Sequence, residues 1–174
     1  LLVNVLKFYS MIDIDEIDKK VISSGNILDE WIISKLNVLI RDVTKLLDDY
    51  ETAETSRLFF NFVEDLSTWY IKNSRERFKS ENSKEKSEAM NTLSYILSIL
   101  SKLLAPITPF ISEMIYQKLK ERGYVNLTSV HLEEWPKYDE TLISSDIELQ
   151  WLCYDNIVND VNNIKKLIKI KNPA

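Results

Sequence analysis

Aromatic and cationic side chains meet in the stretch Trp69 to Lys79, WYIKNSRERFK, and these are the groups in the chain best suited to chemistry. Planar guanidinium groups beside aromatic rings suit the recognition of unstacked bases and phosphates. Lys72, Arg75 and Lys79 are spaced three and four residues apart, so on a helix they project from one side. The stretch therefore predicts a surface that contacts a nucleic acid.

The residues before this stretch predict the helix that carries it. Apolar side chains recur there at helical spacing and mark a buried face: Phe59, Phe62, Val63, Leu66 and Tyr70. Asn73 and Arg77 continue the line of that face, which predicts that they lie at the end of a helical bundle beside Trp69 and Tyr70. Two alternatives stay open: cations in a last helical turn also complement the helix dipole, and Trp69 could belong to the core.

The composition excludes several kinds of active site. Glycine occurs only at positions 25 and 123, which excludes a Gly-rich phosphate loop. His131 and Cys153 are the only histidine and cysteine, so neither a zinc site nor a Cys/His nucleophile pair is supported. The adjacent acids Glu133 and Glu134 are expected to be solvated. The sequence thus predicts no catalytic residue and no metal site.

Positive charge is concentrated in two segments of an acidic chain. The net charge is −5, whereas residues 72–86 carry +3 and residues 161–174 carry +4, so the remainder carries −12. Such a distribution would direct a polyanion to the two segments. Lys165 and Lys169 in the second segment are therefore candidate phosphate contacts, with a solvated helix end as the alternative. No apolar run is long enough to span a bilayer, and a cytoplasmic protein is expected.

Hydrophobic periodicity predicts an all-α fold. We expect residues 1–123 to form an antiparallel bundle of four to five long helices, residues 124–144 an extended strap with at most a short strand, and residues 145–174 a C-terminal helix and the start of a junction. Pro106 and Pro109 must end one helix and begin the next. The buried side of the later helix is expected to be Phe110, Ile111, Met114, Ile115 and Leu119. A capping box from Ser145 to Glu148 is expected to begin the last helix.

Four stretches, in this order, carry a family resemblance: Trp31–Glu51, Phe62–Phe78, Leu100–Leu119 and Ser129–Pro136. They resemble the anticodon-binding domain of class I aminoacyl-tRNA synthetases of the isoleucyl, valyl and leucyl group. The ending SRERF of the second stretch favours the isoleucyl form, because valyl and leucyl forms usually lack it. Asn73 departs from the family pattern, which usually has an arginine there.

The resemblance implies a tRNA-recognition module that docks the anticodon stem-loop of an isoleucine-specific tRNA. It implies that ATP and catalysis belong to another domain of the synthetase chain, that residues 164–174 lead into a further C-terminal region, and that this part holds no cofactor. Neither a membrane partner nor an oligomer is implied. The residues assigned to tRNA binding are Trp69, Tyr70 and Phe78 as rings, and Lys72, Asn73, Arg75, Arg77, Lys79, Lys165 and Lys169 as polar contacts. The alternatives are a valyl or leucyl enzyme, or a protein-binding bundle that docks through Trp151 and Tyr154.

Overall fold

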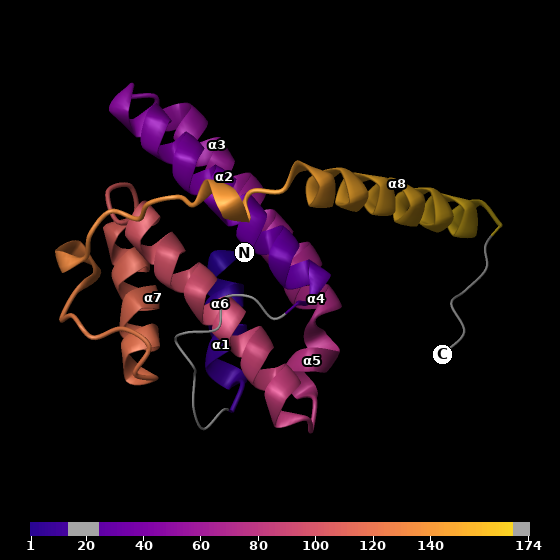
Figure 1. The fold of residues 1–174 in the computed structure, drawn as a ribbon, viewed down its shortest axis with the longest axis horizontal. Helices are drawn as coiled ribbons and strands as arrows, with labels where there is room; N and C mark the ends of the chain where they lie inside the picture. The colour runs from indigo at the N-terminus through magenta and orange to yellow at the C-terminus, as the bar shows by residue number, and fades with distance from the viewer. Residues whose placement is uncertain (14–24, 169–174) are drawn as a thin grey trace. The chain divides into compact units, whose positions relative to one another are not determined.

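The computed structural model describes residues 1–13 and 25–168 of the 174-residue chain. Contacts within the chain divide it into two compact units, Leu1–Ile143 and Ser144–Ala174. Every regular element in the described residues is a helix (Figure 1), which confirms the all-α prediction.

The first unit is a helical bundle, shown in Figure 1, and five helices are its principal elements. They are α1 (Leu2–Met11), α2 (Ile27–Asp48), α3 (Thr52–Glu64), α6 (Ser83–Leu104) and α7 (Pro109–Glu121). Between α3 and α6 lie three shorter pieces: the π-helical turn η1 (Asp65–Tyr70), α4 (Ile71–Asn73) and α5 (Arg75–Lys79). The α2–α3 and α6–α7 pairs pack as hairpins, which is the antiparallel arrangement expected for helices joined by so few residues.

The two longest helices of the bundle, α2 and α6, supply half of its buried apolar side chains. Both begin at an asparagine cap: Asn26 Oδ1 accepts a hydrogen bond from Leu28 N, and Asn82 Oδ1 accepts one from Lys84 N. The fully buried side chains of α2 include Trp31, Ile32, Leu36 and Ile40, and those of α6 include Met90, Leu93, Ile96 and Leu97. In both helices the buried side chains recur at helical spacing and face the core.

The predicted break between α6 and α7 is confirmed, but the predicted buried face of α7 is partly wrong. Thr108 occupies the N-cap position and Pro109 the first helical position. Ile115 and Leu119 are buried as expected, whereas Phe110 is 90% exposed and Met114 is 41% exposed. The buried face is instead rotated toward Ser112 and Tyr116, because the Tyr116 hydroxyl binds a carboxylate in the strap and the small Ser112 packs inside.

The strap, residues 124–144, follows Gly123, whose φ of 70° supplies the left-handed conformation that ends a helix. The short strand that the sequence allowed is absent from the strap, which contains two 3₁₀ turns instead, η2 (Val130–Leu132) and η3 (Glu140–Leu142). Trp135 Nε1 donates to Thr44 Oγ1 at 2.9 Å, and Asp139 N donates to Asn37 Oδ1 at 2.8 Å, so the strap is bound to α2.

The second unit contains α8 (Ser145–Ile168). Ser144 Oγ accepts a hydrogen bond from Ile147 N at 3.4 Å, so the cap lies one residue before the expected one. The rings of Trp151 and Tyr154 lie against each other, with centroids 5.3 Å apart. Within the described residues, none of the helices combines the length and apolarity required to cross a bilayer.

Candidate nucleic-acid interface

The stretch Trp69–Lys79 forms a broken helical segment rather than one continuous helix. In η1 the backbone widens, and Ile71 N bonds to Leu66 O, five residues earlier. Ser74, with φ −94° and ψ 4°, then separates α4 from α5, which are three and five residues long. The regular α-helical pattern is therefore interrupted twice within a few residues, between the helices α3 and α6 of the bundle.

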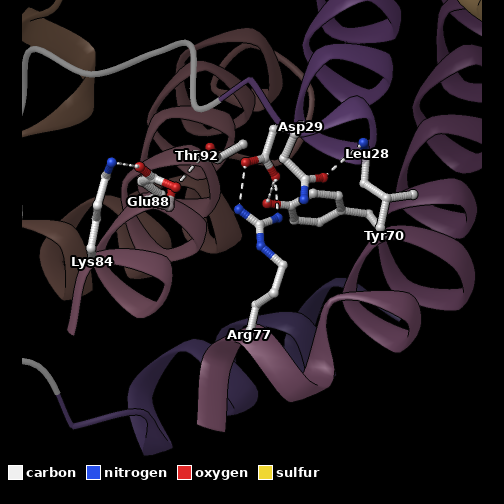
Figure 2. A network of polar contacts seen from close by, with 8 residues as sticks. Leu28, Asp29, Tyr70, Arg77, Lys84, Glu88 and Thr92 are labelled. Atoms are coloured by element: carbon white, nitrogen blue, oxygen red, sulfur yellow. Dashed lines mark hydrogen bonds and ion pairs between the residues drawn. The ribbon is translucent and has the colours of Figure 1, made fainter. Parts of the chain in front are cut away.

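An ion pair links this segment to the first turn of α2 (Figure 2). Arg77 donates from Nη1 to Asp29 Oδ1 and from Nη2 to Asp29 Oδ2, both at 2.8 Å. The Tyr70 hydroxyl donates to Asp29 Oδ1 at 2.8 Å. Asp29 has no exposed surface and the Arg77 side chain is 15% exposed. The arrangement is the bidentate fork in which guanidinium and carboxylate groups bind most strongly.

The contacts of Asp29 shift the pKa of both partners upward. Burial raises the pKa of Tyr70 well above its ordinary value, and the charge and hydrogen bond of Asp29 raise it further. Burial alone would lower the pKa of Arg77, but the hydrogen bond and charge of Asp29 outweigh it and raise that pKa. Tyr70 is therefore a neutral donor and Arg77 a permanent cation across the physiological range.

Tyr70 and Phe78 are buried and do not present ring faces to the solvent. Phe78 packs edge-on against Phe8 of α1 with ring centroids 5.1 Å apart, and against Tyr70 at 6.4 Å. The burial of Tyr70 agrees with its predicted place on the apolar face of the helix, and the assignment of both rings to tRNA binding stays a prediction. In the structure both rings pack inside the bundle and support the segment from within. Trp69 is half-buried, so its ring is neither fully enclosed in the core nor fully open to the solvent.

Three cations of the segment remain available to a partner. Lys72, Arg75 and Lys79 are exposed, and none has a carboxylate within 4.0 Å among the residues that the structure describes. Asn73 is also exposed, which differs from its expected place on the core face, and it donates to Trp69 O within its own helix at 2.9 Å. Lys72, Arg75 and Lys79 are thus exposed, whereas Arg77, which was expected on the line of the core face beside Tyr70, is half-buried and paired with Asp29.

The side chains of the second candidate cluster lie outside the part of the chain that the structure describes. Lys165 lies in α8, but the structure does not describe its side chain, and Lys169 lies outside the described residues. Their assignment to phosphate binding stays a prediction.

Asp29 is the residue of this site that the sequence analysis missed. It falls on one line of α2 with Ile33, Leu36 and Ile40, all of which are buried. A carboxylate on an otherwise apolar helical line must have a partner, because an unpaired buried charge is strongly destabilising. That signal could have indicated a buried ion pair, although it does not identify the partner.

Exposed cations that cluster on a helical domain are a mark of nucleic-acid-binding proteins. Comparison with known proteins gives the family. The model of the anticodon-binding domain of tRNA ligase matches residues 29–174, and the chain belongs to that family.

Curated relatives include the isoleucine–tRNA ligases of Clostridium tetani and Clostridium acetobutylicum, which are 40% and 39% identical to this chain. Each alignment covers 97% of the chain and 17% of the relative. The isoleucine–tRNA ligase of Pyrococcus horikoshii is 37% identical over 82% of the chain and 14% of the relative. The chain thus spans about one sixth of the length of the curated relatives it matches.

Proposed function

We propose that this chain is the part of an isoleucine–tRNA ligase that docks the anticodon stem-loop of isoleucine tRNA. The exposed, unpaired cations Lys72, Arg75 and Lys79 carry this proposal, because they offer an RNA backbone positive charge that no carboxylate of the described bundle neutralises. The relatives described above are named isoleucine–tRNA ligases and align with most of this chain, which supports the isoleucyl assignment over the valyl and leucyl alternatives.

The whole enzyme would join isoleucine to its tRNA using ATP. The nucleotide and the chemistry would belong to a catalytic domain that this chain does not contain, and the bundle itself would need no cofactor. Its part would be to bind the far end of the tRNA, so that only a tRNA with a suitable loop is held long enough to react.

The burial of each side chain in the segment determines which part of the RNA it could contact. Lys72, Arg75 and Lys79 would contact phosphates, which gives affinity without base selectivity. The partly exposed ring of Trp69 and the amide of Asn73 are the remaining groups that could contact a base. One base stacked on an aromatic ring typically contributes about 1–3 kcal/mol, so a single contact would distinguish an opened loop from a paired stem.

A binding measurement tests the proposal. The 174-residue chain is titrated with anticodon stem-loops of isoleucine, valine and leucine tRNAs at several salt concentrations. We expect the isoleucine loop to bind more tightly than the other two, with an affinity that falls steeply as salt rises. Absence of binding would overturn the proposal, and equal binding of all three loops would remove its isoleucine specificity. Binding that does not respond to salt would contradict the assignment of the cations to phosphates.

A further inference from the structure

The short helices α4 and α5 cannot keep their direction unaided. They contain three and five residues, they are separated by the bend at Ser74, and they follow the π-helical turn η1. Helices this short are marginal because too few hydrogen bonds compensate the cost of nucleation. Contacts with the rest of the bundle must therefore fix the direction in which their exposed side chains point.

The most specific of those contacts is the pair of Arg77 with Asp29, which joins residues 48 positions apart in the sequence. Two parallel hydrogen bonds fix the plane of the guanidinium group as well as its position. The carboxylate is itself held in place, because it lies in the capped first turn of α2 and accepts a third hydrogen bond from Tyr70. The pair therefore fixes α5 against a rigid element (Figure 2).

This pairing also removes Arg77 from the set of cations that an RNA can use. Its charge is matched by a buried carboxylate, and most of its side chain is covered. Lys72, Arg75 and Lys79 lie within five positions of Arg77 on the same short helices. Arg75 and Lys79 lie on α5 with Arg77, so a change in the direction of α5 would move these two cations together and away from Lys72 on α4.

We propose that Asp29 and Arg77 are positioning residues for RNA recognition: they hold α4 and α5 in the orientation that presents Lys72, Arg75 and Lys79 to the anticodon stem-loop. This inference rests on the proposed function. It assigns a role in RNA binding to an acidic residue that an RNA backbone would repel.

Neutralising Asp29 distinguishes positioning from direct contact, because the two roles predict opposite signs. Asp29→Asn makes the chain less acidic and releases Arg77, so if Arg77 contacted phosphates directly, the affinity for the isoleucine anticodon stem-loop would stay equal or rise. If the pair positions the other cations, the affinity falls about tenfold or more. The slope of log affinity against log salt also becomes shallower by more than the ~0.7 of one contact, although no exposed cation was removed.

A matched control is Asp48→Asn, the same substitution at the last residue of α2, where the side chain is exposed. The two aspartates are about 28 Å apart along the helix axis. The control should change the affinity less than twofold. Titration of the active fraction separates weaker binding from partial unfolding, because unfolding lowers the stoichiometry of binding and leaves the salt slope of the folded fraction unchanged.

If the Asp29→Asn variant does not fold, the Arg77→Lys variant tests the positioning role instead. Lysine keeps the charge but cannot form the two parallel hydrogen bonds. We expect it to bind the stem-loop at least threefold more weakly than Arg57→Lys, a charge-conserving control on an exposed side chain of α3. Equal binding by these two variants, or unchanged or tighter binding by a folded Asp29→Asn, would overturn the positioning role. Failure of the unmodified chain to bind would instead reject the proposed function itself.

Discussion

The hydroxyl of Tyr116 on α7 donates a hydrogen bond to the carboxylate of Glu133 in the strap. The same carboxylate accepts from Lys102 Nζ of α6 at 2.9 Å. Glu133 is only 18% exposed, so the expectation that this residue is solvated is wrong. One side chain of the strap thus binds both helices of the α6–α7 hairpin.

Acid should weaken this attachment of the strap. Burial opposes ionisation of Glu133, but the hydrogen bonds from Tyr116 and Lys102 outweigh it and lower the pKa of Glu133 below its ordinary value. A lowered pKa in the folded state means that the contact stabilises fully above the unfolded pKa of about 4.3. Its contribution is then lost as the pH falls through the lower folded pKa. Urea unfolding at a series of pH values should show this decline.

Glu133→Gln should remove the decline in stability that comes from protonation of Glu133. It should also lower the free energy of unfolding at neutral pH by about 1.5–3 kcal/mol, the usual contribution of hydrogen bonds to a charged group. The neighbouring exposed residue provides the control, Glu134→Gln, which should leave the profile unchanged. An equally steep decline in both variants would assign the acid sensitivity to other carboxylates.

Removing one partner of the Asp29–Arg77 pair should destabilise the bundle strongly. Asp29→Ala leaves the guanidinium of Arg77 covered and without its carboxylate, which typically costs about 3–5 kcal/mol. Chemical denaturation measures the change, with Asp48→Ala expected within about 0.5 kcal/mol of the unmodified chain. The double variant Asp29→Ala with Arg77→Ala should be much less destabilised than the sum of the single changes, because no unpaired charge remains. Additive losses would mean that the two residues are not coupled.

Much of the fold could be predicted from the sequence because its signals are local. The alternating steps of three and four in α6, the prolines at 106 and 109, and the left-handed Gly123 each act over a few residues. The buried face of α7 was less predictable. That face depends on which aromatic residue, Phe110 or Tyr116, has a binding partner in the bundle. The partner of Tyr116 is Glu133, which lies in the strap, a segment whose apolar residues show no helical spacing.

The candidate site was predicted in outline but with a shifted register. The line of buried residues through Leu66 and Tyr70 was extended to Asn73, whereas the structure buries Ser74 and Phe78. The π-helical turn η1 explains this shift, because it holds one more residue than an α-helical turn and rotates every later side chain. Nothing in the alternation of apolar residues marks such an insertion. The partner of Arg77 was unpredictable for another reason, since it lies 48 residues away.

Arg75 should contribute one phosphate contact to RNA binding and nothing to stability. Its side chain is exposed and has no ion pair with any residue that the structure describes. Arg75→Ala should therefore weaken binding of the isoleucine anticodon stem-loop several-fold and reduce the salt slope by about 0.7. Its thermal unfolding should match that of the unmodified chain. Arg57→Ala, which removes an exposed arginine from α3, is the control. Equal affinities of these two variants would remove Arg75 from the RNA contact.

Ser74 gives the last prediction, because its hydroxyl is buried without a hydrogen-bond partner in the described residues. The backbone contacts of the bend, from Ser74 N to Tyr70 O and from Phe78 N to Ser74 O, do not need the side chain. Ser74→Ala should therefore leave the bend intact and raise the free energy of unfolding by up to about 1 kcal/mol, since it removes a desolvated hydroxyl.

The matched control for Ser74 is Ser112→Ala on α7. Ser112 is equally buried, but its hydroxyl donates to Thr108 O at 2.9 Å, so the substitution should lower the free energy of unfolding by about 1 kcal/mol. Denaturant unfolding of both variants measures the difference in sign. If Ser74→Ala is as destabilised as Ser112→Ala, the hydroxyl of Ser74 has a partner in solution, and the bend between α4 and α5 depends on a side chain as well as on the backbone.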